Sequence, residues 1–402
     1  MQQNKLKIAV ISDLHCHPER KKSSENNTLL FSDKLRMPTM DHPVEHLLEI
    51  IASENVNVDL VLSPGDFTHQ SDRQGFFSGW SYVTELARAM NSKSVIATIG
   101  NHDIDSRHQY SEYSFDIPKK IKQNFPLESK YLGTFWESGF TFIEQENYQI
   151  LVINSTHFHT HYNVDATIEN PAVKGKIDRA QIEQIEKYLK LNNDNTKIKI
   201  ALCHHHPVKH SRNELGEHDF VENGDELIDV LGKYKYDLFI HGHKHDPWLR
   251  YINAGNGHLL PVLSSGSFSA TNQISWINKF NYFHIIEFTK DNSSNSTGKI
   301  ETWTFKRANG WKKDKEDGFY PYTGFGYLDN LKDLSDKIEA LLLPALNGML
   351  PWSSLLQSIP EIENLTPEKM EELESFLNTK QIFLNEKIGL RPKHIYIYHE
   401  RI

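Results

Sequence analysis

The feature that most constrains the fold is a repeated short apolar run that ends at polar residues. Seven such runs, rich in Val, Ile and Leu, lie at residues 7–12, 58–63, 94–99, 149–154, 197–203, 237–240 and 259–264. Their length and their branched side chains are typical of buried strands rather than helices.

Helical patterns lie between several of these runs, at residues 43–54, 76–90 and 178–190. Alternating strands and helices predict an α/β fold with a largely parallel sheet. Two later strand-like segments, 282–289 and 299–306, follow each other without a helix. Part of the sheet is therefore expected to be antiparallel.

The chain is longer than a single hydrophobic core usually supports, since it has 402 residues. We expect a catalytic domain at 1–307, a linker at 308–326 rich in Gly, Pro and charge, and a mainly helical C-terminal region at 327–402. Insertions are expected in the first domain at 19–40, 104–138 and 155–177.

Helical signals mark the C-terminal region. Thr366 is expected to cap a helix that begins at Pro367, and apolar residues recur at helical spacing from Leu328 to Leu341. Such a stripe packs first on its own domain, but it also suggests a role in oligomer formation or in binding a protein partner.

Charge and cysteine content limit the class of protein. A formal net charge of -9 gives no overall attraction to nucleic acid or anionic membranes. Cys16 and Cys203 are too few for a disulfide framework. With no secretory or membrane-spanning pattern, we expect a soluble cytoplasmic protein.

The polar clusters carry the chemistry. They read "SDLHCH" at 12–17, "PGDFTH" at 64–69, "IGNHD" at 99–103, "HHHP" at 204–207 and "HGHKH" at 241–245. Each follows a predicted strand, where an open α/β sheet forms its ligand crevice. Carboxylate, amide and imidazole groups are ligands of transition metals, and Mn, Fe, Co, Ni and Zn all remain open.

In this order the clusters resemble the calcineurin-like metallophosphoesterases. The family pattern is D-x-H, G-D, G-N-H-D/E, a His two places before Pro, and G-H-x-H, and the resemblance covers roughly residues 5–305. It implies a layered αββα sandwich of two mixed β-sheets flanked by helices. It also implies hydrolysis of phosphoric esters by a hydroxide that bridges two metal ions.

The resemblance also implies a role for individual residues. The first ion would be held by Asp13, His15, Asp66 and His245, and the second by Asp66, Asn101, His205 and His243. His205 is chosen because it lies two places before Pro207, whereas strand alternation is expected to turn His204 to the opposite face.

Catalytic and substrate-binding residues are expected beside these ligands. His102 resembles the histidine that gives a hydrogen bond or proton to the leaving oxygen, with Asp103 as its orienting partner. Asn101, His102 and His206 are expected to contact the substrate phosphate.

The subclass follows from departures in the second motif. Protein phosphatases of the family extend it as G-D-x-V-D-R-G, but this chain reads "GDFTHQSDRQG" at 65–75. The "HHP" and "GHKH" motifs look more like the cyclic-nucleotide phosphodiesterase branch, so we expect a phosphodiesterase acting on a nucleotide-like substrate. A recombination-repair nuclease, a phosphomonoesterase and a non-catalytic metal-binding scaffold are the alternatives.

Overall fold

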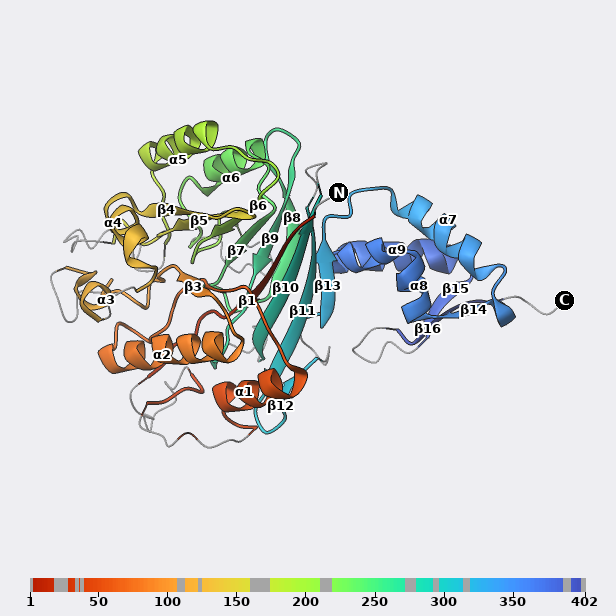
Figure 1. The fold of residues 1–402 in the computed structure, drawn as a ribbon, viewed down its shortest axis with the longest axis horizontal. Helices are drawn as coiled ribbons and strands as arrows, with labels where there is room; N and C mark the ends of the chain where they lie inside the picture. The colour runs from red at the N-terminus through yellow and green to blue at the C-terminus, as the bar shows by residue number, and fades with distance from the viewer. Residues whose placement is uncertain are drawn as a thin grey trace.

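The computed structural model describes residues 3–17, 28–32, 36, 40–106, 113–121, 125–159, 174–209, 219–271, 280–291, 296–313, 319–385 and 392–398. Much of the expected insertion at 19–40 and residues 160–173 of the insertion at 155–177 lie outside these ranges. Figure 1 shows a larger unit built around two stacked sheets and a smaller C-terminal unit beside it.

The first sheet is mixed and has seven strands in the order β12-β11-β10-β1-β2-β3, with β13 also paired to β11. The pairs β1–β2 and β2–β3 are parallel, and the other pairs are antiparallel. The strands are β1 (Asn4–Val10), β2 (Leu60–Ser63), β3 (Ser94–Ala97), β10 (Asn281–Lys290), β11 (Ser296–Lys306), β12 (Gly310–Lys312) and β13 (Tyr322–Phe325). The expected antiparallel pair is therefore confirmed as β10 and β11.

The second sheet has six strands in the order β4-β5-β6-β7-β9-β8. Its four central strands are parallel, and an antiparallel strand lies at each edge. The strands are β4 (Phe140–Glu144), β5 (Tyr148–Ile153), β6 (Ile198–Leu202), β7 (Leu238–His241), β8 (Trp248–Asn253) and β9 (Leu259–Ser264).

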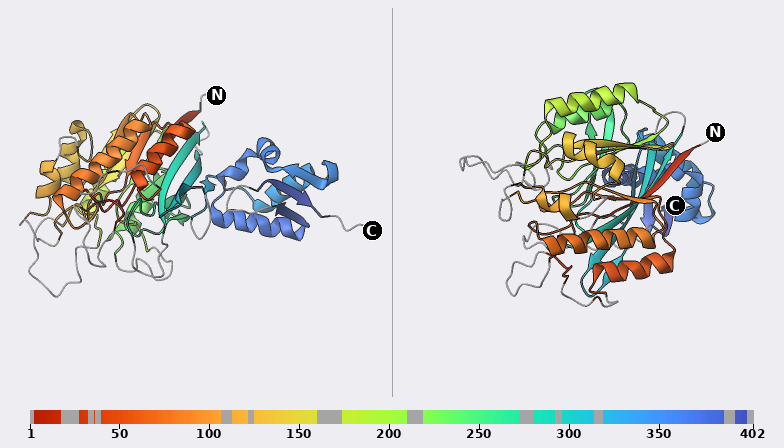
Figure 2. Two further views of the ribbon diagram at one scale, coloured as in Figure 1. Left: turned by 90° about the horizontal axis from the view of Figure 1, so that it is seen from below. Right: turned by 60° about the vertical axis from the view of Figure 1, so that its left-hand side comes forward.

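Helices cover the outer faces of both sheets (Figures 1 and 2). On the first sheet lie α1 (Pro43–Glu54) and α2 (Arg73–Ala89), and on the second lie α5 (Arg179–Leu191) and α6 (Gly224–Lys233). The expected αββα sandwich is confirmed. The short helices α3 (Asp116–Ile121) and α4 (Ser129–Ser138) belong to the segment expected as the insertion at 104–138.

Local sequence signals explain where these helices begin. The Asp72 side chain accepts a hydrogen bond from the backbone N–H of Gly75 at the start of α2. At α5, Asp178 and Gln181 form a reciprocal capping box. Both caps satisfy backbone donors that the first helical turn leaves open.

The main core lies between the two sheets and continues under α1 and α2. In β6, Ile198, Ile200 and Leu202 face this core, while Ala201 faces a second core beneath α5 and α6, as does Cys203 directly after the strand. This two-residue alternation determines which side chains after β6 enter the space between the sheets.

The C-terminal unit has its own hydrophobic core, formed by its helices and a three-stranded antiparallel sheet. Its elements are α7 (Leu331–Leu342), η2 (Leu346–Gly348), β14 (Met349–Pro351), α8 (Trp352–Ser358), η3 (Pro360–Asn364), α9 (Pro367–Thr379), β15 (Ile382–Asn385) and β16 (His394–Ile397). Thr366 caps α9 and Pro367 begins it, as predicted.

The segment 308–326, expected as a linker, differs from that expectation. It contributes β12 and β13, which both pair with β11. The C-terminal unit attaches at β13, where the Gly324 N–H donates a 2.9 Å hydrogen bond to the Leu365 carbonyl. The two units are therefore joined through backbone contacts rather than through a free connection.

No helix in the described ranges is long and apolar enough to cross a membrane.

Candidate metal centre

The five polar clusters meet at one end of the space between the sheets. Asp13 and Asp66 follow β1 and β2 of the first sheet, and Asn101 lies after β3. His204 follows β6, and His243 follows β7, so the second sheet closes the site. Both sheets thus contribute side chains from the carboxyl ends of parallel strands.

The backbone at this site is unusual. Asp13, His15, Asp66, His243 and His245 all have positive φ, between 49° and 71°. Left-handed backbone costs free energy for residues other than glycine and is concentrated at functional sites. Here it turns the side chains at the strand ends toward one another.

The first set of converging ligands is Asp13, His15 and His245. Nε2 of His15 lies 3.0 Å from Nε2 of His245, and His245 Nε2 lies 3.3 Å from an oxygen of Asp13. Oδ2 of Asp66 lies 3.4 Å from His15 Nε2. The four side chains predicted for the first ion therefore come together.

The second set shares the same Asp66 oxygen. Nε2 of His204 lies 3.3 Å from Oδ2 of Asp66 and 3.1 Å from Oδ1 of Asn101. The ring centre of His243 is 5.1 Å from that of His204. Asp66 is thus in contact with both sets, as a bridging carboxylate must be.

The position of His204 corrects the sequence-based expectation. His204 does not turn to the opposite face but lies between Asp66 and Asn101. The alternation of β6 explains this, because His204 continues the series of Ile200 and Leu202, which face the space between the sheets. The periodicity of β6, continued past Leu202, is the signal that indicates this orientation of His204.

His205, the residue predicted as ligand, lies on the other side of this set. Its Nδ1 is 2.8 Å from Ser155 Oγ, and its ring centre is 4.4 Å from that of His243. Its Nε2 is buried and has no hydrogen-bond partner among the described residues. His205 thus joins the group of His204 and His243 but has no comparable contact with Asp66 or Asn101 in the described part of the chain.

Asp103 also has a different partner from the one expected. Its carboxylate accepts hydrogen bonds from the backbone N–H groups of Asp66, Phe67, Thr68 and Gly100, at 2.6 to 3.2 Å. None of the hydrogen bonds of Asp103 in the described chain goes to His102. The residue therefore fixes the backbone that carries Asp66 rather than the imidazole of His102.

His102 lies at the exposed edge of the site, where its ring centre is 4.7 Å from that of His15. The backbone N–H of Gln70 donates to its Nδ1 at 3.2 Å. An imidazole that accepts at Nδ1 carries its proton on Nε2. His69 stacks on this ring at 5.3 Å and belongs to a further histidine group with His15 and His102.

Asp219 is a residue near the site that no sequence motif indicated. Its Oδ2 lies 3.2 Å from Nε2 of His243 and also contacts the ammonium of Lys244. His206, expected to contact substrate, is fully buried, and its Nε2 lies 3.7 Å from Oδ1 of Asp219. Asp219 follows a segment without a strand signal, so its proximity depends on the tertiary fold.

One insertion reaches the site. Nδ1 of His159 and Oγ of Ser106 form a hydrogen bond of 3.3 Å. The ring centre of His159 is 6.5 Å from that of His205. The segment after β5 and the segment after β3 are therefore in contact beside the metal ligands.

Burial and charge act in opposite directions at this centre. Burial opposes ionisation of Asp13, but hydrogen bonds from His15 and His245 hold its pKa well below the usual range. Burial lowers the pKa of His243 to about 3, so its imidazole is neutral. Burial and the charge of Asp66 raise the pKa of Asp103 to about 8, against the hydrogen bonds from the backbone.

The donor set fits a pair of metal ions. Carboxylate, amide and imidazole groups converge, and two imidazole nitrogens face each other at 3.0 Å. The pKa values favour ionised Asp13 and neutral His243, the protonation states in which these groups bind metal. At His204 burial lowers the pKa, but the charge of Asp66 outweighs it and raises the pKa to about 9, so metal binding there would displace a proton.

Comparison with known proteins gives two family matches. The family model described as calcineurin-like phosphoesterase matches residues 6–247. A second model, described as wHTH-Calcineurin_assc, matches residues 323–379, where wHTH abbreviates winged helix-turn-helix. The helices α8 and α9, followed by the antiparallel strands β15 and β16, are consistent with that description.

The comparison with solved structures finds matches of low sequence identity, with TM-scores below 0.5. A dimetal phosphatase from Danio rerio is 12% identical, with a TM-score of 0.45, and the alignment covers 75% of this chain and 99% of that one. A purple acid phosphatase from yellow lupin seeds is 14% identical, with a TM-score of 0.44, over 81% of this chain and 54% of that one. No curated protein sequence matches significantly.

Proposed function

Because the chain belongs to the calcineurin-like phosphoesterase family, we propose that it is a dinuclear metal-dependent phosphodiesterase that hydrolyses nucleotide-like phosphodiesters. The observation that carries the dinuclear assignment is the shared oxygen of Asp66, 3.4 Å from His15 Nε2 and 3.3 Å from His204 Nε2. One carboxylate oxygen thus lies between two sets of ligands.

Asp13, His15, Asp66 and His245 would hold the first ion, and Asp66, Asn101, His204 and His243 the second. Bound there, two transition-metal ions would supply Lewis acidity toward the phosphoryl oxygens and a nucleophile at neutral pH. Replacing His205 by His204 in the second set follows from the contacts with Asp66 and Asn101.

His102 is the general acid in this proposal, the group that protonates the leaving oxygen. Since Gln70 N–H occupies its Nδ1, the proton on Nε2 is the one that this ring can donate to a leaving oxygen. Asp103 acts through the backbone. It accepts hydrogen bonds from the N–H groups of Asp66 and Gly100, and it therefore positions the two loops that carry Asp66 and Asn101. Asn101 and His102 are the substrate contacts that this arrangement supports best.

The choice of a diester substrate rests on sequence. The departure of residues 65–75 from the protein-phosphatase pattern and the "GHKH" motif support it. The nuclease alternative needs a basic path for a strand. The helix α9 of the winged helix-turn-helix instead carries Glu368, Glu371, Glu372 and Glu374 against one Lys, which disfavours contact with phosphates.

The test is hydrolysis of bis(p-nitrophenyl) phosphate against p-nitrophenyl phosphate with Mn²⁺ present. We expect faster diester hydrolysis, and we expect Asp66→Ala to abolish it while Asp225→Ala, an exposed carboxylate on α6, leaves it unchanged. Preferred hydrolysis of the monoester would replace the proposal by a phosphomonoesterase. Cleavage of single-stranded DNA at a higher rate than of cyclic nucleotides would favour the nuclease.

A further inference from the structure

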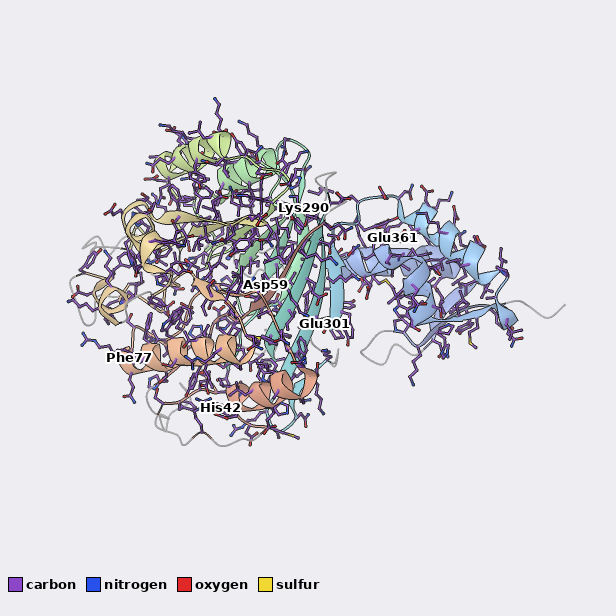
Figure 3. All side chains as sticks on the ribbon, viewed as in Figure 1. His42, Asp59, Phe77, Lys290, Glu301 and Glu361 are labelled. Atoms are coloured by element: carbon purple, nitrogen blue, oxygen red, sulfur yellow. The ribbon has the colours of Figure 1, made fainter. Side chains whose placement is uncertain are left out.

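A cavity of about 430 Å³ lies at the junction of the phosphoesterase domain and the C-terminal unit. One wall comes from β10, β11 and the segment around β13, and the other from α8, η3 and α9. Figure 3 labels Glu301, a residue of the first wall, on the side of the large sheet that faces the C-terminal unit. Sites for small organic molecules are common between domains and have volumes of roughly 300 to 1,000 Å³.

Direct contacts between the two units lie beside this cavity. The Gly324 N–H donates a hydrogen bond of 2.9 Å to the Leu365 carbonyl, and Tyr320 donates one to the Glu371 side chain. Leu365, Tyr320 and Glu371 also line the cavity. The two units therefore meet around a space that the described side chains do not fill, whereas protein interiors seldom contain voids larger than a water molecule.

Both walls of the cavity carry apolar surface. Apolar side chains from the C-terminal unit line it and belong to or pack against the core of that unit, namely Trp352, Leu356, Ile362, Leu365 and Met370. The facing wall adds Ile300 and the rings of Tyr320 and Tyr322. A ligand with an apolar body would therefore exchange water for aliphatic and aromatic contacts.

The charged residues of the lining are mostly acidic. The glutamates are Glu287, Glu301, Glu363, Glu371 and Glu374, and the described lining includes one cation, Lys299. Their effect is visible at Tyr320, where burial, then the hydrogen bond to Glu371 and the charges of Glu371 and Glu374, raises the pKa of the phenol above its usual value. The negative potential that disfavours a phenolate also disfavours an anionic ligand.

The carboxylates of the lining already interact with groups of the protein. Ion pairs join Glu363 to Lys299, Glu287 to Lys7 and Glu301 to Lys313. Glu371 accepts the hydrogen bond from Tyr320, and Glu374 also interacts within the protein. A cationic ligand would have to displace such partners while it lost its own hydration. An uncharged ligand has neither cost.

We propose that this cavity binds an uncharged, mainly apolar organic molecule with an aromatic or branched aliphatic body. The body would pack on Trp352, Leu356 and Met370 of the C-terminal unit and on the ring of Tyr322 from the phosphoesterase domain. Because both domains form the walls, the bound molecule would bridge them. Its binding depends neither on the metal centre nor on the activity proposed above.

The experiment is a fluorescence titration of N-phenyl-1-naphthylamine with the full chain. This probe is uncharged, and its fluorescence rises when it leaves water. Its analogue 8-anilinonaphthalene-1-sulfonate has the same rings and an added sulfonate. We expect the uncharged probe to bind at a single site with a Kd on the order of 100 μM, as its number of non-hydrogen atoms allows. The sulfonate should bind at least about tenfold more weakly, because the acidic lining repels it.

Substitutions that fill the cavity locate the site. Met370→Trp on α9 and Leu356→Trp on α8 each add an indole ring to the lining. Met349→Trp is the matched control, because Met349 lies on β14, is 43% exposed and is not among the described lining residues. Each filling variant should weaken binding of the uncharged probe at least about tenfold, and the control less than about twofold.

Thermal melting followed by circular dichroism shows that the variants are folded, and the use of two helices makes the test independent of either filling variant alone. Loss of probe binding in a folded filling variant, with binding retained in Met349→Trp, supports the proposal. Equal affinity for the two probes, equal binding by the filling variants and the control, or no binding of the uncharged probe to the wild type would overturn it. Loss in Met349→Trp alone would place the probe on the exposed apolar surface near Leu346 and would also overturn it.

Discussion

Nε2 of His204 lies 3.1 Å from the amide oxygen of Asn101, and Nδ1 of the same ring lies 2.9 Å from the carbonyl oxygen of Pro64. The carbonyl accepts a hydrogen bond from Nδ1–H, so Nε2 is the nitrogen that faces Asn101 and Asp66 and that would bind a metal ion once it has lost its proton. This is the arrangement of a metal-ligating histidine.

We therefore expect His204→Ala to lower bound Mn²⁺ from about two ions per chain to about one. His205→Ala is the matched control, because it removes the neighbouring imidazole whose Nδ1 contacts Ser155. It should retain both ions after dialysis. Elemental analysis of the two purified variants checks this. Loss of an ion from His205→Ala alone would show that His205, two places before Pro207, is the ligand instead of His204.

Asp219 should strengthen the second metal site. Its carboxylate holds Nε2 of His243 at 3.2 Å, which leaves Nδ1 of that ring for the ion and orients the ring. Asp219→Asn should lower the affinity for the second ion about 10- to 100-fold without changing the affinity for the first. Titration with Mn²⁺ measures both affinities. Glu222→Gln breaks an ion pair with Lys176 at the surface and should change neither affinity. A similar loss of metal affinity in this variant would contradict the role of Asp219 at the second site.

His102 should matter most for poor leaving groups. Its Nε2 proton assists an alkoxide far more than a p-nitrophenolate, which departs without help. His102→Ala should lower turnover of an alkyl phosphodiester by about 10² to 10⁴ and affect the p-nitrophenyl diester much less. Metal content is measured in parallel and should remain unchanged. Equal losses on both substrates would rule out a proton donor.

Gly324 should be required for attachment of the C-terminal unit. A Cβ at this position would collide with backbone atoms of Glu363, Gly298 and Asn364, none of which is a flexible side chain. Gly324→Ala should lower the free energy of unfolding by about 1 to 3 kcal/mol and make the junction more sensitive to proteolysis.

Gly133→Ala is the control for this substitution. Nothing lies within 4 Å of a Cβ there, and the residue is inside α4. Alanine should leave stability unchanged or raise it slightly, because it favours helix more than glycine. Melting temperatures and trypsin digestion compare both variants, and equal behaviour would contradict the close packing at Gly324.

Lys199 should make stability depend on alkaline pH. It is fully buried and donates to Asn193, Asn195 and the Tyr234 carbonyl. Burial, then the charge of Lys290, lowers its pKa to about 8 in the folded protein, against about 10.4 for an unfolded chain. Between these values the unfolded state binds more protons, so the contribution of Lys199 to stability rises with pH.

The measurement is urea unfolding at pH 7.5 and pH 9.5. The difference in unfolding free energy between wild type and Lys199→Met should shift in favour of wild type by on the order of 1 kcal/mol at the higher pH. Lys190→Met, at the exposed end of α5, should show no such shift. A difference that is independent of pH would mean that Lys199 keeps its proton.

The sequence alone indicated the alternating strands and helices and the polar clusters at the strand ends, and the family resemblance implied the αββα arrangement. The apolar runs became β1, β2, β3, β5, β6, β7 and β9, and every predicted helix of the first domain lies within two or three residues of its expected start. These features are local, since hydrophobic periodicity and capping residues specify strands and helices independently of distant contacts. The motifs at the strand ends lie close together in the structure, because the carboxyl ends of parallel strands lie at the same edge of a sheet.

Tertiary structure decided the rest. The contacts of His204 with Asp66 and Asn101 depend on which face of β6 meets the other sheet, and the hydrogen bonds of Asp103 depend on how the loops after β2 and β3 pack. Asp219 reaches His243 from a segment with no motif, and β13 joins the sheet although its sequence resembles a linker. Such contacts join residues far apart in the chain, and no local pattern of polarity or spacing encodes them.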